Sequence, residues 1–393
     1  MNKRYILTLS IVVIGLWICS TTIFRDNLSE SIRFINDNAD RGDYYKRGMW
    51  LVNQSVPYLD VFSEYPQIPT WLFGIVHIPF LNQTDNNVAR LNYIALFSLL
   101  MTGMLIALAE IISRLLAKEK LKYIYFLLLP APLYFALNRF DVLPATICTL
   151  TLFMVNKEKW GYAAVLLALG TFTKWYPALL LFPILIYMRK TNPKPERILK
   201  FLILFFATSF LIVLPTYLSG GMNAILAPYL FHNNRGAEIL SLLGLIEVIL
   251  LELTSIHLEQ VLNITFLLLQ IIAIPFLFFT RLNTFEKLLN WCLLIITLYI
   301  LFARIYSPQW ILWVFPLLII SSRDKIDIGL IWIYGIVTYI GFPLIFDIFG
   351  NPSLQMILMG FITNSILLAI AIETGRHLVL LSRTENTPAA LEI

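Results

Sequence analysis

The run YILTLSIVVIGLWICSTTIF, residues 5–24, carries no charged side chain and is long enough to cross a bilayer, which takes about 20 apolar residues as a helix. Lys3 and Arg4 precede it as they would precede a signal peptide, but no small-x-small cleavage site follows it. We therefore expect this segment to be retained as the first membrane span.

Apolar runs of this kind recur to the end of the chain. Of its residues 59% are hydrophobic and 13% charged, about half the charged fraction of an average soluble domain. The further runs are Val88 to Ser113, Tyr123 to Leu137, Val142 to Val155, Gly161 to Thr173, Tyr176 to Met188, Ile198 to Leu218, Val261 to Thr280, Leu288 to Phe302, Trp310 to Ile320, Ile328 to Ile345 and Leu354 to Ile372. They predict an all-α polytopic membrane protein with one membrane domain, 1–393, and about 12 transmembrane helices, some of them short or broken.

Basic residues are distributed unevenly between the two sides of these spans. If the N-terminus is cytoplasmic and the spans alternate, most of the 29 Lys and Arg residues lie on the cytoplasmic side, as the positive-inside rule predicts. Both termini are then cytoplasmic. The outer segments are a first loop, 25–87, with surface helices, and a second loop, 219–259, with a surface amphipathic helix.

The first outer loop concentrates acids and tyrosines. Residues 36–69 read NDNADRGDYYKRGMWLVNQSVPYLDVFSEYPQIP, and within 25 residues of this stretch Asp40, Asp43, Asp60 and Glu64 stand beside four tyrosines. One interpretation makes Asp40 the N-cap of a short helix, with Asp43 in its first turn and paired to Arg47 at i+4. A second, compatible interpretation makes Asp43 a general base that accepts the proton of an attacking hydroxyl.

A second group of polar residues lies at the outer ends of the predicted spans. Each could be an ordinary interfacial side chain that reaches toward lipid headgroups. Together with the acidic loop on the same side, the cations among them are suited to binding the phosphate of an anionic lipid. The group is Asn138, Arg139, Asp141, Lys174, Tyr176, His232, Arg235, Glu238, Arg304, Tyr306 and Gln309.

Several familiar motifs are absent from the sequence. The chain has no G-x-x-x-x-G-K-[ST] loop, no H-E-x-x-H and no C-x-x-C, and its three cysteines fall inside apolar runs. These absences argue against ATP-driven transport and zinc proteolysis. We expect no cofactor and no nucleic-acid partner.

Six pieces of the sequence together resemble a known family, the C-type (GT-C) integral-membrane glycosyltransferases. The resemblance is strongest to polyprenol-phosphate-mannose-dependent mannosyltransferases and looser to the glycosylphosphatidylinositol mannosyltransferase. The pieces run through most of the chain in the expected order, which is more specific than any one of them. They are GDYYKRG (42–48), VPYLDVFSEYPQIP (56–69), NRFDVLPA (138–145), TFTKWYPALLLFP (171–183), YLFHNNRGAEILS (229–241) and RIYSPQWILWVFP (304–316).

The resemblance implies a GT-C-like bundle with an extracytoplasmic catalytic loop, in the plasma membrane if the organism is prokaryotic. It implies inverting transfer of a sugar, mannose, from a polyprenyl-phosphate donor to a hydroxyl of a lipid or glycan acceptor among membrane lipids. The matching catalytic position is Asp43, which would deprotonate that hydroxyl. No metal is expected, because Asp40 and Asp43 are separated by two residues and do not form Asp-x-Asp.

The leaving phosphate needs positive charge rather than a general acid. The candidates to bind it are Arg304, Lys174, His232 and Arg235, with Arg139 in reserve. The residues expected to form the sugar or acceptor pocket, or to brace it, are Asp40, Tyr44, Tyr58, Glu64, Tyr65, Asp141, Tyr176 and Gln309. The loop departs from the family pattern after Glu64 and Tyr65, where Pro66 is followed by Gln67 and not by a second proline.

Two other classes of function remain open from the residues. A carrier or flippase for a lipid-linked or small anionic solute would also place cations at the membrane rim. Such transporters often have paired halves, whereas the acidic outer loop occurs once here. A structural scaffold for an envelope complex is the third reading, and convergent charge argues against it.

Overall fold

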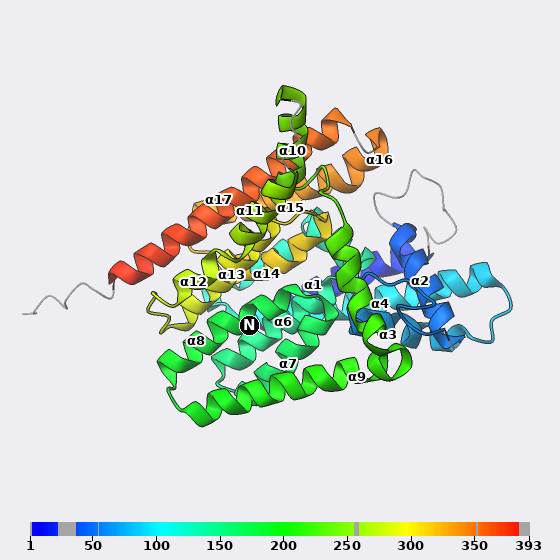
Figure 1. The fold of residues 1–393 in the computed structure, drawn as a ribbon, viewed down its shortest axis with the longest axis horizontal. Helices are drawn as coiled ribbons and strands as arrows, with labels where there is room; N and C mark the ends of the chain where they lie inside the picture. Colours follow the sequence, from blue (N-terminus) through cyan, green and yellow to red (C-terminus); the bar gives the residue numbers. More distant parts are fainter. Residues whose placement is uncertain (1, 23–36, 54, 255–258, 351–352, 385–393) are drawn as a thin grey trace, which may run out of the picture. The chain divides into compact units, whose positions relative to one another are not determined.

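The computed structural model describes residues 2–22, 37–53, 55–254, 259–350 and 353–384 (Figure 1). Within these ranges the chain is helical, and its only β-type pairing is an isolated bridge between Pro57 and Val61. The contacts group the chain into two compact units, residues 1–178 with 200–235 and residues 179–199 with 236–393. The all-α prediction is confirmed.

The first unit contains the acidic loop and the apolar helices that follow it. A pair of helices from the loop, α2 and α3, packs together and against α4, and α4 in turn packs on α6. Its elements are α1 (Asn2–Thr22), α2 (Asn38–Val52), α3 (Gln67–His77), η2 (Ile78–Phe80), α4 (Asn86–Leu115), η3 (Lys118–Leu128), α5 (Pro130–Asn138), α6 (Val142–Asn156), α7 (Trp160–Thr173) and most of α9 (Pro195–Asn234).

Close helix packing in the first unit depends on aromatic and small side chains. On α4, Tyr93, Phe97 and Met101 recur at helical spacing and are buried. Between α2 and α3 the backbones approach so closely that a Cβ on Gly48 would lie 2.3 Å from the carbonyl oxygen of Phe73. This glycine lets the two loop helices form one rigid support for the loop between them.

The second unit is built around α13, which packs against α14 and α17, while α17 also packs along α15 (Figure 1). The helix α14 is buried at every position. The elements are α8 (Leu181–Thr191), α10 (Leu242–Thr254), α11 (Glu259–Ile271), α12 (Ala273–Leu277), α13 (Phe285–Leu301), η5 (Pro308–Trp310), α14 (Ile311–Ser321), α15 (Lys325–Tyr339), η6 (Ile340–Ile345), α16 (Phe346–Phe349) and α17 (Leu354–Thr384), with η4 (Tyr176–Leu180) spanning the boundary between the two units.

Five helices of the described chain are long and apolar enough to cross a membrane, or six if the bent pair η3 and α5 counts as one span. They are residues 3–22, 86–115, 195–232, 325–349 and 354–383. The predicted count of about twelve is not confirmed, because several apolar runs form helices too short to span the roughly 30 Å hydrocarbon layer alone. The helix α6, for example, has 15 residues.

The exposed surface of these helices is largely apolar. On α9, Ile203, Phe206, Phe210 and Leu211 are each more than half exposed. A continuous apolar exterior of this kind needs lipid rather than water around it. Together with the long apolar helices, it supports a multi-pass membrane protein.

The long helix α9 is not uniform. Its backbone leaves helical geometry at Gly221, whose φ of 65° is a conformation that favours glycine. Residues 222–234, predicted to be part of an outer loop, therefore form a second helical segment. This segment ends at the polar residues described next.

Candidate functional site

The loop helix α2 begins at a cap different from the predicted one. Asp37 is the N-cap, since its Oδ1 accepts a hydrogen bond from Ala39 N at 2.9 Å. The backbone N–H of Asp37 donates to Asn138 Oδ1 at 3.0 Å, which docks the start of α2 on the end of α5. The prediction that Asp40 is the cap is wrong, and Asp40 lies in the first turn.

Arg139 joins these carboxylates in a buried network. Its Nη2 lies 2.5 Å from Asp37 Oδ2 and its Nε lies 2.7 Å from Asp40 Oδ2, while its side chain is 4% exposed. Arg41 adds a second buried guanidinium, which donates to the Asp37 carbonyl and to Ser98 Oγ. Arg139, the reserve phosphate ligand, is therefore engaged by two carboxylates of the protein itself and fixes α2.

The two carboxylates respond oppositely to this environment. Burial opposes ionisation of Asp37, but the charge of Arg139 and the Ala39 N–H outweigh it and lower the pKa of Asp37. Burial raises the pKa of Asp40, and nearby Asp37, Asp43 and Glu64 add to that rise against the attraction of Arg139. Asp40 thus has a stronger affinity for a proton than an ordinary aspartate.

Asp43 lies on the open side of α2. Its side chain is 59% exposed and its Oδ1 lies 3.6 Å from Lys46 Nζ. The predicted i+4 pairing with Arg47 is wrong, because Arg47 instead lies over the Tyr65 ring and approaches Glu64. The carboxylate of Asp43 is consequently accessible to a molecule that approaches α2.

Glu64 and Tyr65 are carried by a braced loop between α2 and α3. The buried Tyr58 hydroxyl donates to the Tyr65 carbonyl at 3.0 Å and lies 3.1 Å from Thr70 Oγ1, which also contacts Ser63 Oγ. Tyr58 has a φ of 72°, so the loop turns sharply there. Of the roles left open for Tyr58, bracing the loop fits these contacts.

Aromatic rings form the floor beneath this loop. Tyr44 is 1% exposed and stacks on Phe73 with ring centroids 4.4 Å apart. Tyr65 meets Phe140 edge-on at 4.9 Å. Tyr44 is therefore part of the support for Tyr65, and it is not itself open to a ligand.

Lys174 reaches the same rings from the end of α7. Its Nζ lies 4.6 Å from the Phe140 centroid and 5.0 Å from that of Tyr65. It also lies 3.4 Å from Oδ1 of the fully buried Asp141, the residue before α6. The contact brings two predicted site residues together, whereas Tyr176 is buried behind them at 2% exposure.

His232 and Arg235 reach Glu64 from the end of α9. His232 Nε2 donates to the Glu64 carbonyl at 3.0 Å, and Arg235 Nη1 lies 3.9 Å from Glu64 Oε2. Trp175 meets His232 edge-on at 5.0 Å and so holds the imidazole in place. We call Arg47, Glu64, Tyr65, Lys174, His232 and Arg235 the Glu64 cluster.

The Glu64 cluster therefore unites segments far apart in sequence, all within the first unit. Arg47 was not among the predicted ligands, although its place one turn after Asp43 could have indicated it. Two carboxylates lie on or beside the same face of α2 as Arg47: Asp40, seven residues before it, and Asp43, four residues before it. The site combines proton acceptors with three cations and an imidazole.

Arg304 and Gln309 belong to the second unit. The carbonyl of Arg304 accepts a hydrogen bond from Glu238 N at 2.9 Å. Gln309 lies in η5 beside Pro308. Pro308, the buried Tyr306, Met356 and Met359 line a small pocket of about 10 Å³, room for about one water molecule. This pocket is mainly apolar.

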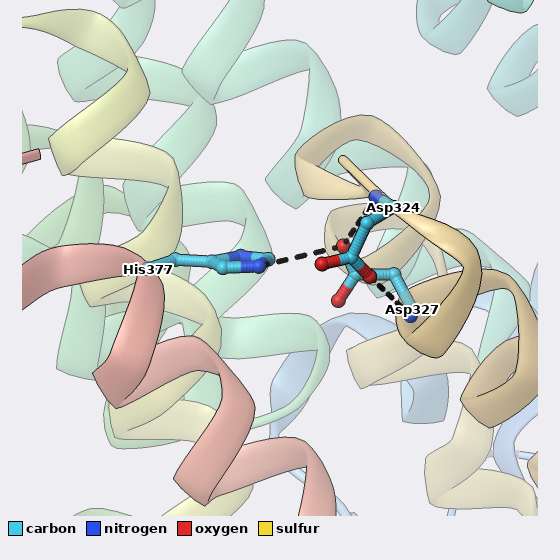
Figure 2. Close-up of side chains that lie close together, drawn as sticks. All are labelled: Asp324, Asp327 and His377. Carbon is cyan, nitrogen blue, oxygen red and sulfur yellow. Dashed lines mark hydrogen bonds and ion pairs between the residues drawn. The ribbon is translucent and has the colours of Figure 1, made fainter. Parts of the chain in front are cut away.

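The second unit also holds an acidic and histidine cluster that the sequence did not indicate. Figure 2 shows the His377 ring, from α17, directed at Asp324 and Asp327 at the start of α15. His377 Nε2 lies 3.6 Å from Asp327 Oδ2, and the two aspartates form a reciprocal capping box.

Such a set of donors could be considered for a metal ion, but a cation is already present. Arg376 Nη2 lies 2.7 Å from Asp324 Oδ2 and also contacts Glu373, whose Oε1 lies 3.2 Å from His377 Nε2. Backbone N–H groups of Arg323 and Asp324 occupy Asp327 Oδ2. We assign this cluster to fastening α17 to the start of α15.

No protein-family model and no curated protein sequence matches the chain.

Proposed function

We propose that this protein is a membrane-embedded glycosyltransferase that moves a sugar from a polyprenyl-phosphate donor to an acceptor hydroxyl. The observation that carries the proposal is the Glu64 cluster beside Asp40 and Asp43. An inverting transfer needs a base at the acceptor and positive charge at the leaving phosphate. A carboxylate on α2 would supply the base, and the cations around Glu64 would supply the positive charge, within one site.

Asp43 is our candidate for the base. It is the more exposed of the two α2 carboxylates, so an acceptor hydroxyl could reach it from outside the helix. Asp40, held by Arg139 and with a raised pKa, would lie closer to the sugar. The acceptor loses its proton to Asp43, its oxygen bonds to the anomeric carbon, and the bond to the phosphate oxygen breaks.

The cations that we assign to the phosphate are those of the Glu64 cluster, Arg47, Lys174 and Arg235, with His232 as a hydrogen-bonding neighbour. They would stabilise the phosphate as negative charge builds on it. Arg304 remains a proposed further ligand. An anionic leaving group explains why no general acid is required.

The arrangement of helix ends supports an extracytoplasmic site. The helix α6 begins next to Asp141 and ends before Lys157, while α7 begins after Lys159 and ends at Lys174. A cluster of lysines likewise follows the far end of α4. If these elements cross the membrane, the positive-inside rule puts the lysine-rich ends in the cytoplasm and the Glu64 cluster outside.

The finer predictions belong to the same proposal. They are a GT-C-like bundle of about twelve crossings, cytoplasmic termini, mannose as the sugar, and a lipid or glycan as acceptor. The short helices α6 and α7, 15 and 14 residues long, would cross only where the protein or lipid locally thins the apolar layer.

The test is a transfer assay with purified protein in proteoliposomes. Polyprenyl-phosphate mannose labelled in the sugar is supplied with a lipid acceptor extract, and both the glycosylated product and free polyprenyl phosphate are measured. The proposal predicts that they form in equal amounts. Movement of intact donor across the bilayer without cleavage would instead identify a flippase and overturn the enzyme assignment.

A further inference from the structure

Two arginines approach the carboxylate of Glu64 from different helices. Arg47 Nη2 lies 3.9 Å from Glu64 Oε1, and Arg235 Nη1 lies 3.9 Å from Oε2. Each carboxylate oxygen therefore has one guanidinium as a distant neighbour. A closed ion pair is about 1 Å shorter, typically 2.7–2.9 Å.

The same chain shows that its arginines can form closed pairs. Arg139 lies within 2.7 Å of Asp40, and the exposed Arg114 lies 2.7 Å from Glu110. The long distances at Glu64 are therefore not a general feature of the arginine pairs in the described residues. In addition, Arg47 Nη1 is buried with no hydrogen-bond partner among the described residues, which is an unfavourable state for a guanidinium.

Aromatic rings hold the two guanidinium groups apart. Arg47 lies over the rings of Tyr65 and Phe62, at 5.2 and 5.9 Å, and Arg235 lies 6.0 Å over Phe231. Phe62 and Phe231 meet edge-on at 4.7 Å. Closing both guanidinium groups on the carboxylate would therefore shift them relative to the rings that they contact.

We propose that the Glu64 carboxylate stands in the place of a phosphate group, which binds between Arg47 and Arg235 and displaces the Glu64 side chain. A phosphate is larger than a carboxylate and offers more acceptor oxygens, so it reaches two separated guanidinium groups at once. The ligand class is a phosphate monoester or diester. The inference rests on the proposed function and adds to it Glu64 as an internal competitor for the phosphate.

The structure permits this exchange without moving the loop. His232 holds Glu64 through its backbone carbonyl, and the side chain of Glu64 is 24% exposed. The carboxylate can turn outward by giving up its hydrogen bond with the Tyr65 side chain, while the backbone of the loop stays in place. Like-charge repulsion from the incoming phosphate favours that turn.

The test measures binding without any sugar transfer. Calorimetric titration of the purified full-length protein uses inorganic phosphate in one series and geranyl phosphate in a second. Glu64→Gln keeps the size of the side chain and removes its charge, so phosphate should bind about fivefold more tightly than to the wild type, the equivalent of ~1 kcal/mol. Arg47→Ala should lose most of the binding, and Arg47→Lys part of it.

Arg114→Ala, which opens an exposed pair with Glu110, is the matched control and should bind as the wild type does. Equal gains for both ligands in Glu64→Gln support recognition of the phosphate alone, and a larger gain for geranyl phosphate supports a lipid-linked phosphate. Unchanged or weaker binding of both ligands by Glu64→Gln would overturn the inference. If Glu64→Gln binds phosphate more tightly but the wild type transfers no sugar, the proposed function is wrong and the phosphate site stands.

Discussion

Among the cations of the first unit, we expect Arg139 to be the one whose replacement lowers the stability of that unit most. Its guanidinium is buried and pairs with Asp37 and Asp40. Arg139→Leu leaves both carboxylates without their partner in a largely buried place, and removal of one partner of a buried pair costs ~3–5 kcal/mol. For a unit of this size we expect a fall in unfolding temperature on the order of 10 °C.

The control is Arg114→Ala, because the Arg114 pair with Glu110 has the same 2.7 Å separation but is exposed. Exposed pairs contribute ~0–1 kcal/mol, so the unfolding temperature should hardly change. Both variants are measured by thermal unfolding in the same detergent. Adding Asp37→Asn to Arg139→Leu should cost less than the sum of the single changes, since one unpaired charge is then removed. Equal shifts for Arg139→Leu and Arg114→Ala would refute the reasoning.

Three further predictions concern other residues. Burial raises the pKa of Asp40, so the folded wild type loses stability as the pH rises from about 3.9, the pKa in the unfolded chain, through the raised pKa in the folded protein. Asp40→Asn cannot titrate, so its free energy of unfolding should increase relative to that of the wild type across this pH window, as measured by chemical denaturation at stepped pH. Gly48→Ala forces a Cβ against the Phe73 carbonyl and should lower the unfolding temperature, whereas Gly103→Ala, with open space around it in a helix, should be neutral or slightly stabilising. Arg304→Ala should reduce sugar transfer more than Arg304→Lys, which keeps the charge but not the two-pronged geometry; equal rates for both and for wild type would remove Arg304 from the site.

Hydrophobic periodicity and length were sufficient to predict the helical class. The long run of residues 88–113 became a single helix, α4, which begins at the side-chain cap Asp85. The number of membrane crossings could not be predicted from the length of the apolar runs, because a run of 14 or 15 apolar residues can be a short buried helix or part of a broken span. Only packing between helices distinguishes these cases.

The candidate site was predictable in residue type but not in pairing. The sequence around Asp37 and Asp40 offers several possible caps, and the hydrogen bond from Asp37 N to Asn138, about a hundred residues away, selects among them. Arg47 was predicted to pair within its own helix, but it lies instead over aromatic rings of the following loop. Such choices depend on tertiary contacts that local spacing does not contain.

We propose that a carboxylate on α2, Asp43, deprotonates the acceptor of a sugar transfer. The most direct measurement compares transfer from polyprenyl-phosphate mannose by wild type, Asp43→Asn and Asp60→Asn in proteoliposomes at matched protein insertion. Asp60 is the control, because its carboxylate lies in the same outer loop and, among the described residues, accepts a hydrogen bond only from the Val56 N–H of a turn, at 2.8 Å. Loss of a general base predicts a fall of roughly 10²–10⁴-fold for Asp43→Asn and little change for Asp60→Asn. Wild-type transfer by folded Asp43→Asn would contradict the claim.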